Sequence, residues 1–231
     1  MPHLYELRPL PTEVGGVPIA WLDPSKVKVE KGRDEWKLLA RQEKGQLLLP
    51  IYPENDFLPL VGGKLLLINH GTNYASGRRN SFCGRDESPF HAFVTEEAVK
   101  AYKEGGSEGF FESLVPKLIK ELRERPDIPD SYVRQGDWFT NRLPFSWLEI
   151  EQFVRLGRGK EFDIVEVKKE SLGGTRHHFT GRLVREVPIF GWKCLLLEGV
   201  LSAPDHKDLV LSGGPHVIAQ AANLADPENA E

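Results

Sequence analysis

Residues 177–220 read HHFTGRLVREVPIFGWKCLLLEGVLSAPDHKDLVLSGGPHVIAQ and carry the clearest fold signal in the chain. Short apolar runs alternate with glycine, proline and polar residues, a pattern typical of β-strands joined by turns. Strands are predicted at HFTGRLV, WKCLLLEGVL, DLVL and HVIAQ, with DIVEV upstream of them. Four of the seven histidines of the chain fall in this stretch, which therefore also holds the first candidates for a functional site.

The rest of the chain completes the fold prediction. Before position 95, runs such as VPIAWL, QLLLPIY and KLLLINH are separated by turn residues, which again indicates strands. Between these two β-rich parts the apolar residues take a helical spacing. We therefore predict an α+β fold with β-rich N- and C-terminal parts around a helical middle, and a small barrel or sandwich for the C-terminal part.

Three helices are predicted in the middle of the chain. Thr95 is a good N-cap for a short helix over 95–102, and apolar residues recur at helical spacing over 111–122. Ser146 and Glu149 match a capping box, so a third helix begins there. Each of these helices is expected to lay its apolar face on a core.

The domain organisation follows from the turn-forming and polar segments. RPDIPDS, at 125–131, is the best candidate for a boundary between two lobes because it combines two prolines with polar residues. We predict a single compact domain over 1–223. Residues 224–231 are polar and acidic, and we predict that they form a disordered tail.

Composition and cysteine usage favour a soluble cytoplasmic protein. The 231 residues are 40% hydrophobic and 28% charged, with a formal net charge of −4, and they show no apolar run of signal-peptide or membrane-helix length. We therefore expect no membrane partner. Cys83 and Cys194 make no disulfide framework and suit a reducing compartment. Cys83 and His91 would form a thiolate and its base if the fold brought them together, although packed side chains are the favoured interpretation.

The histidines predict a metal site. His177 and His178 are adjacent on a predicted strand, so their side chains point to opposite faces and at most one of them can enter a shared site. His178, His206 and His216 are the predicted ligands, with His206 and His216 placed at turns ten residues apart. Three imidazoles, or two with a carboxylate, would hold zinc or iron and leave a coordination position open for water or substrate.

Two other interpretations of the histidines stay open. Two of them could act as general acid and base around a scissile phosphate without a metal. Alternatively, they hydrogen-bond carbonyl groups at turns and have a structural role. Metal binding and acid–base catalysis both require at least two imidazoles to converge within about 5 Å, the reach of shared coordination.

The turn RQGDWF, at 134–139, supplies the remaining site candidates. Asp137, or Asp205 beside His206, would be the orienting carboxylate, and Arg134 would be an electrophilic clamp. Trp138 offers an aromatic face on which a polar ligand or a base could stack. Turns of this kind are also common as pure structure, so a functional role depends on whether the turn faces the histidines.

A polar loop predicted over 71–89 carries a second candidate surface. Its Arg78, Arg79 and Arg85 could bind a phosphate or a carboxylate bidentately. Because the net charge of −4 gives no general attraction for polyanions, any binding of nucleic acid would rest on this local patch.

Two resemblances accompany these patterns. FCGRDE (82–87), RQGDWF (134–139) and PDHKDLVL (204–211) resemble stretches of uncharacterised bacterial and phage proteins, which implies that they belong to one architecture and carries no function. The histidine pattern resembles the two metal-binding motifs of cupins, although here the paired histidines are adjacent and Glu186 follows His178 by eight positions.

The sequence as a whole therefore leaves two hypotheses. The first is a histidine-based, metal-dependent enzyme that acts on a small-molecule or nucleic-acid ligand through a site in the C-terminal half. The second is a non-catalytic protein that binds nucleic acid or a larger complex through the arginine-bearing loop. The two differ in a structural expectation, because the first requires the histidines to converge and the second leaves them scattered.

Overall fold

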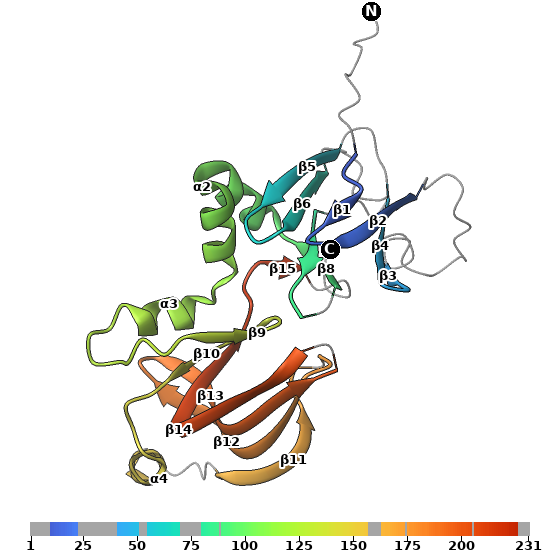
Figure 1. The fold of residues 1–231 in the computed structure, drawn as a ribbon. Helices are drawn as coiled ribbons and strands as arrows, with labels where there is room; N and C mark the ends of the chain where they lie inside the picture. The colour runs from blue at the N-terminus through green and yellow to red at the C-terminus, as the bar shows by residue number, and fades with distance from the viewer. Residues whose placement is uncertain are drawn as a thin grey trace, which may run out of the picture. The chain divides into compact units, whose positions relative to one another are not determined.

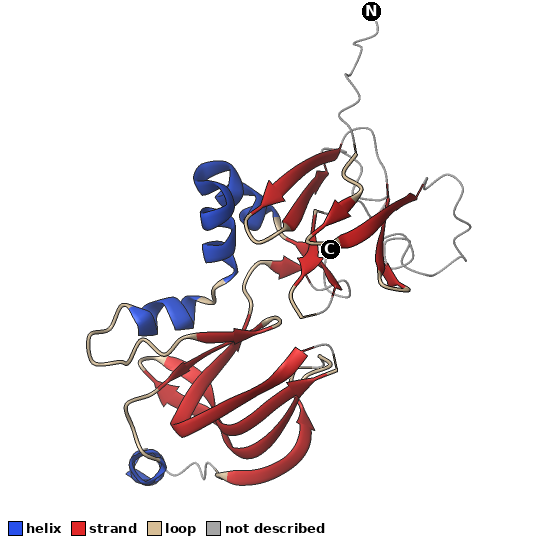
Figure 2. Ribbon diagram, in the orientation of Figure 1, coloured by secondary structure: helices blue, strands red, loops and turns tan. Residues whose placement is uncertain are grey.

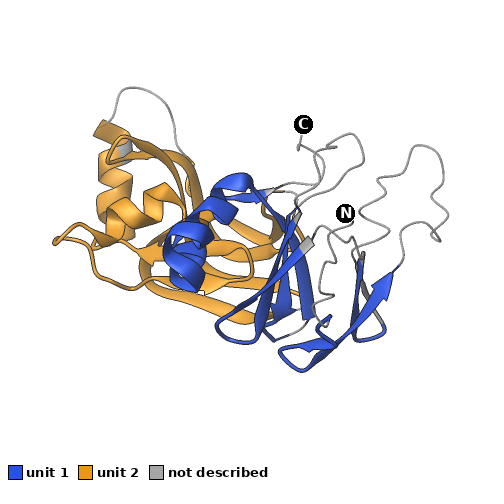
Figure 3. Ribbon diagram, turned by 90° about the horizontal axis from the view of Figure 1, so that it is seen from above, with its two compact units in different colours: residues 1–112, 223–231 blue, residues 113–222 orange. Residues whose placement is uncertain are grey.

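The chain folds as two compact units, which Figure 3 shows in different colours. The first unit comprises Met1–Glu112 and Asn223–Glu231, and the second comprises Ser113–Ala222. In this computed structural model the structure is described for residues 10–22, 41–50, 55–69, 80–87, 89–156, 163–173, 175–204 and 206–225. The boundary at Glu112 and Ser113 lies upstream of 125–131, which falls inside the second unit; the single domain over 1–223 remains a prediction.

The first unit contains two β-sheets (Figures 1 and 2). One sheet has the order β1-β2-β4-β3 and is formed by β1 (Glu13–Val14), β2 (Val17–Leu22), β3 (Arg41–Glu43) and β4 (Gln46–Pro50). The other has the order β15-β8-β7-β6-β5 and is formed by β5 (Asn55–Leu60), β6 (Lys64–Asn69), β7 (Ser81–Arg85), β8 (Pro89–Val94) and β15 (Leu224–Ala225). The apolar runs VPIAWL, QLLLP and KLLLIN thus form strands, as predicted.

Two predictions for this unit are wrong in part. Ser81–Arg85, predicted to lie in the 71–89 loop, is strand β7, because the apolar side chains of Phe82 and Cys83 are buried in the sheet. Leu224–Ala225, predicted to belong to a disordered tail, pairs with β8 as β15. The backbone N–H of Thr95 also donates to the carbonyl of Asn223 at 3.0 Å, which holds this end of the chain at the sheet.

Cys83 and His91 are direct partners across β7 and β8. Burial raises the pKa of the Cys83 thiol to about 12 and lowers the pKa of His91 to about 4, so both groups are neutral at neutral pH. A reactive thiolate needs the opposite environment, one that lowers the pKa of its thiol. The pair is therefore packed rather than activated, in agreement with the favoured interpretation of Cys83.

Lowering the pH is expected to destabilise the first unit through His91. Because its pKa falls from 6.5 to about 4 on folding, the unfolded chain binds a proton in this interval that the folded chain does not. The free energy of unfolding therefore keeps its full value above pH 6.5 and decreases by about 3 kcal/mol as the pH drops toward 4. Urea unfolding of the wild type and of His91→Leu at about pH 7 and 4.5 measures this decrease; equal decreases in both proteins would contradict it.

The helices differ from the prediction in their boundaries. Helix α2 (Glu96–Leu114) begins after the Thr95 cap, whose hydroxyl accepts from the N–H of Ala98 at 3.4 Å. It does not stop near 102 but runs on through a kink at Gly106, where φ is +62°. A separate helix, α3 (Lys117–Arg123), starts after Pro116. No helix among the described residues is long and apolar enough to cross a membrane.

The second unit is built on one six-stranded antiparallel sheet of order β11-β12-β13-β14-β10-β9. Its strands are β9 (Val133–Gln135), β10 (Trp138–Arg142), β11 (Val165–Ser171), β12 (His178–Ile189), β13 (Trp192–Ala203) and β14 (His206–Gln220). Figure 1 shows that the sheet is strongly twisted. Its described strands leave β11 and β9 as edges, so they do not close into the predicted barrel, while the α+β fold class is confirmed.

DLVL and HVIAQ, predicted as two strands around an SGG turn, form the single strand β14. Leu197 of β13 pairs with His216, and Gly199, two residues on, pairs with Leu211. The extra residues of β14 are absorbed in a bulge that contains Gly213 and Gly214, both at positive φ. The chain therefore keeps its direction where a turn was predicted, and this decides where His216 lies.

Helix α4 (Trp147–Leu156) begins at the predicted capping box. The N–H of Ser146 donates to Oε2 of Glu149 at 2.7 Å, and the N–H of Glu149 donates to Oγ of Ser146 at 3.2 Å. The Trp147 indole donates to Glu198 at 2.6 Å, and the N–H of Gly214 donates to the other oxygen of this carboxylate at 2.7 Å. Glu198 thus ties the start of α4 to the bulge in β14.

Candidate functional site

The RQGDWF segment forms the tight turn between β9 and β10. Gln135 pairs with Trp138 across the turn, which leaves Gly136 and Asp137 at its tip. Gly136 has φ of +58°, a conformation that favours glycine. Nε of Arg134 donates to the carbonyl of Gly136 at 2.5 Å, so this guanidinium braces its own turn. The predicted turn is confirmed.

The turn faces two histidines. A Cβ built on Gly136 would lie 2.8 Å from Nε2 of His206 and 3.0 Å from Nε2 of His177, so both Nε2 atoms lie within 3.0 Å of one position beside the turn. The two rings are nearly parallel, with centroids 5.7 Å apart and 18° between their planes. His177 is buried and His206 is half-buried, so a ligand would reach the pair from the His206 side.

Asp137 lies beside His177. Oδ1 of Asp137 lies 3.4 Å from Nδ1 of His177, and Oδ2 accepts from the side-chain amide of Gln220 at 2.6 Å. Oγ1 of Thr175 lies 3.3 Å from the same Nδ1 and accepts from the N–H of His177 at 3.2 Å. With Nδ1 directed at a carboxylate and a hydroxyl, Nε2 is the atom of His177 that is turned to His206 and Gly136.

Trp138 and Gln135 contact the residues that surround the two histidines. Trp138 is 6% exposed and belongs to the core cluster of this unit, so its ring is not a platform for a stacked base. Its indole donates to Thr175 at 3.3 Å, and its ring meets that of His177 edge-on at 6.5 Å between centroids. The Gln135 amide donates to the carbonyls of Leu201 and Lys207, at the turn that carries His206.

The three predicted ligands do not assemble. His178 begins β12 opposite Ser202, and it is its neighbour His177 that faces the turn. His206 pairs with Ala203 and His216 with Leu197, so six residues of β13, about 20 Å of strand, separate the two. The predicted convergence of these three side chains is therefore replaced by that of His177 and His206.

His216 has its own environment at the bulge. Its Nδ1 donates to the carbonyl of Gly214 at 2.9 Å, and burial lowers its pKa. Among the described residues, no group of three or more histidine, cysteine, aspartate or glutamate side chains is placed to hold a metal ion. The described part of the chain therefore contains no group of side chains that matches the zinc or iron site predicted from His178, His206 and His216.

The remaining predicted residues divide in two. Asp205, Arg78 and Arg79 lie outside the described residues, and so does most of the arginine-bearing loop. Arg85 is described and lies exposed at the end of β7, in the first unit. Asp137 lies 3.4 Å from Nδ1 of His177, which was not a predicted ligand, and Arg134 donates to the carbonyl of its own turn, so the roles predicted for both residues stay predictions.

Sequence reasoning missed His177, Thr175 and Gln220. Because His177 and His178 are adjacent, only one of them can point toward the turn, and the sequence does not tell which one. Gln220 lies 83 residues from Asp137 in the chain. The two side chains meet because β10 and β14 pair with Trp138, the neighbour of Asp137, opposite Gln220. No local pattern marks such a residue.

Comparison with known proteins adds no relative. No protein-family model, no curated protein and no solved structure matches the chain. The resemblances to cupins and to uncharacterised bacterial and phage proteins therefore remain predictions, and the function has to be argued from the geometry of the site.

Proposed function

We propose that the second unit is a histidine-based enzyme in which His177 and His206 transfer protons to and from a bound substrate, with Asp137 orienting His177. The observation that carries the proposal is the approach of both Nε2 atoms to one point beside Gly136. A turn that only connected two strands would not need a second imidazole stacked on the first. The turn faces the histidines, which was the condition for a functional role of RQGDWF.

His177 is the proposed general base. Asp137 and Thr175 favour the tautomer with the proton on Nδ1, which leaves the Nε2 lone pair available to accept a proton. The carboxylate also stabilises the imidazolium that forms when Nε2 is protonated. The distance of 3.4 Å is long for a hydrogen bond, as catalytic hydrogen bonds often are before the substrate is bound.

His206 is the proposed general acid. It is half-buried, so it can exchange protons with solvent between turnovers, whereas His177 is enclosed. Arg176 precedes His177 and Lys207 follows His206, so two cations lie near the site in the chain, although Lys207 and His206 are neighbours on β14 and their side chains point to opposite faces. Cationic neighbours favour an anionic substrate, and paired imidazoles suit the transfer of protons around a phosphodiester.

Hydrolysis of bis(p-nitrophenyl) phosphate by the full chain tests the proposal. We expect His177→Asn and His206→Asn each to lower the rate by about 10²-fold or more, because each removes one partner of the proton transfer. His178→Asn and His216→Asn are matched controls, since they are the adjacent and the bulge histidine, and they should keep the wild-type rate within about threefold. Equal rates in all four variants would contradict the proposal.

Two further measurements separate the proposed chemistry from its alternatives. Long-range ¹H–¹⁵N spectra of the imidazoles should show the Nδ1–H tautomer for His177, and Asp137→Asn should change it. Activity that survives a chelator supports proton transfer by the two imidazoles. Activity that is lost with the chelator and regained with zinc or iron would instead support the predicted metal-dependent route.

We also propose a reducing, cytoplasmic compartment for this chemistry. Cys83 and Cys194 are both free and both buried. Burial raises the pKa of Cys194 to about 11, so like Cys83 it is held as the neutral thiol. Because both cysteines are buried as thiols, neither unit relies on a disulfide for its stability, which suits a reducing compartment.

A further inference from the structure

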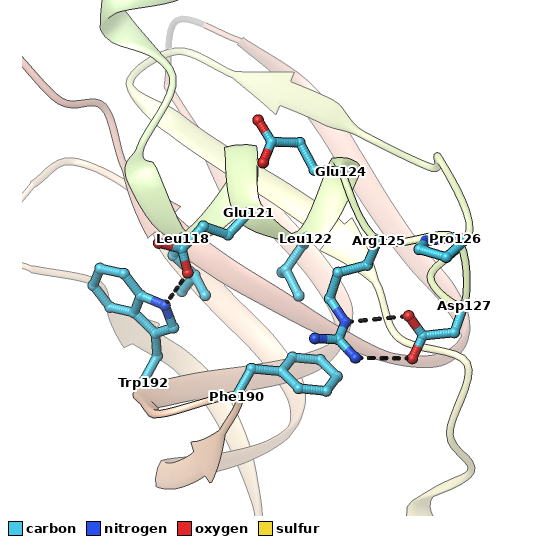
Figure 4. A pocket seen from close by; sticks show the side chains of 9 residues that line it. All are labelled: Leu118, Glu121, Leu122, Glu124, Arg125, Pro126, Asp127, Phe190 and Trp192. Atoms are coloured by element: carbon cyan, nitrogen blue, oxygen red, sulfur yellow. Dashed lines mark hydrogen bonds and ion pairs between the residues drawn. The ribbon is translucent and has the colours of Figure 1, made fainter.

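A second concave site lies in the second unit, away from the histidines. It is a hollow of about 550 Å³ between α3 with the segment after it and the β12–β13 turn (Figure 4). The turn lies where Ile189 pairs with Trp192, at the end of these strands opposite to His178. A volume of this size is in the range that holds a small organic molecule.

The hollow has an apolar floor and aromatic sides. Leu118 and Leu122 of α3 are buried beneath it, and Phe190 and Trp192 come from the hairpin. Figure 4 shows the two rings with Leu122 between them. The Trp192 indole donates to Oε2 of Glu121 at 2.7 Å, which fixes the orientation of its ring. A ligand that enters the hollow would therefore meet the Trp192 ring in a fixed orientation.

Phe190 holds a conformation that an aromatic residue rarely adopts. Its φ is +49°, in the left-handed region where glycine, asparagine and aspartate are usual, and its side chain is 40% exposed. Such a backbone costs about 1 kcal/mol and persists where the surroundings require it. The two-residue turn formed by Phe190 and Gly191 requires a positive φ at both positions, and it places the exposed ring of Phe190 at the rim of the hollow.

Both aromatic rings already attract cations from the chain itself. Nζ of Lys117 lies 5.7 Å from the centroid of the Trp192 ring, and Cζ of Arg125 lies 3.7 Å from that of Phe190. Arg125 also pairs with both carboxylate oxygens of Asp127, at 3.2 and 3.1 Å, so its charge is compensated. One face of each ring is thus already occupied by a positive group of the chain itself, so a ligand cation would have to compete with that group for the ring.

The charged groups of the lining are mostly negative. Three carboxylates, those of Glu121, Glu124 and Asp127, line the hollow with the single guanidinium of Arg125. Lys117 lies next to them and contacts Glu121 at 3.6 Å. These carboxylates would repel an anion, whereas an organic cation would be attracted both by the carboxylates and by the aromatic rings.

We propose that this hollow binds a small organic cation of the methylated-ammonium class, with the Trp192 ring as its main contact and Phe190 closing the side. The site is separate from the histidines and does not depend on the function proposed for them. Lys117 covers the Trp192 ring in the absence of such a ligand and is displaced when the ligand binds.

Titration with choline tests the proposal, with 3,3-dimethyl-1-butanol as an uncharged molecule of the same shape. Binding to the full chain is followed through the indole N–H resonance of Trp192, at constant ionic strength. We expect a saturable shift with a Kd of about 1–10 mM for choline and binding at least about tenfold weaker for the alcohol. No shift up to about 50 mM choline, or equal binding of the two molecules, would overturn the proposal.

Three variants complete the test. Phe190→Leu keeps the apolar volume but removes the ring, and it should weaken choline binding by about threefold or more. Lys117→Met should strengthen binding, because it removes the positive charge that competes with the ligand for the Trp192 ring. Lys100→Met is its matched control, since Lys100 also belongs to an i,i+4 pair on a helix, with Glu104 at 3.9 Å. Equal affinities of the two methionine variants would count against the proposal.

Discussion

Gly136→Ala is expected to lower catalysis at the His177–His206 site by about 10²-fold or more. The new Cβ would lie 2.8 Å from Nε2 of His206, closer than real Cβ atoms approach, and 3.0 Å from Nε2 of His177, so at least the His206 imidazole has to move. Both atoms are at the ends of side chains that can rotate, so the displacement itself costs little stability. It does remove the alignment on which proton transfer depends, and φ of +58° adds about 1 kcal/mol of backbone strain.

Gly191→Ala is the matched control for this prediction. Gly191 also has a positive φ, of +86°, but a Cβ there would meet nothing within 4 Å. The control therefore carries the backbone strain without displacing a neighbour. The rate of bis(p-nitrophenyl) phosphate hydrolysis and the free energy of unfolding in urea are to be measured for both variants. If Gly136→Ala keeps the rate of Gly191→Ala, the two Nε2 atoms do not form a catalytic pair beside Gly136.

Gly199→Ala is expected to destabilise the second unit by about 3 kcal/mol or more, the largest stability effect that we predict for a single methyl group. Gly199 and Gly181 are partners across β12 and β13. A Cβ on Gly199 would meet the carbonyl oxygen of Thr180 and lie 2.8 Å from Cα of Gly181. These are backbone atoms, so the clash cannot be relieved by rotating a side chain, and the two strands would have to separate.

Thermal and urea unfolding of Gly199→Ala test this expectation. Gly181→Ala should behave alike, because its Cβ would meet the backbone of Glu198 and Gly199. Gly191→Ala again serves as the control, since it has a positive φ and open space, and it should lose only about 1 kcal/mol. A loss for Gly199→Ala that is no larger than that of the control would show that the strands can adjust to the extra atom.

The elements that were predicted correctly have their causes close together in the chain. Ser146 and Glu149 satisfy each other's backbone N–H groups, so the start of α4 is a matter of four residues. Thr95 starts α2 with a single bond of this kind, from the N–H of Ala98 to its hydroxyl. The turn at Gly136 requires a positive φ that glycine provides at its own position. Such interactions depend little on the rest of the fold.

The elements that were predicted wrongly depend on residues far away. The Gly213–Gly214 segment is indistinguishable from a turn by composition, and it becomes a bulge because β13 continues alongside it and Glu198 accepts from the N–H of Gly214. Ser81–Arg85 contains a glycine and polar residues like a loop, yet it pairs with β6 and β8. In both cases strand pairing overrides the local signal.

The histidine site depends partly on the sequence and partly on the tertiary structure. From sequence come the identities of the candidates, the rule that His177 and His178 cannot share a face, and the turn that supplies Asp137. The choice of His177 over His178, the separation of His216 from His206 and the recruitment of Gln220 come from strand register, which hydrogen bonds between distant segments determine. A shift of one residue reverses the face of every side chain in a strand, so a site built across strands is decided when the sheet forms.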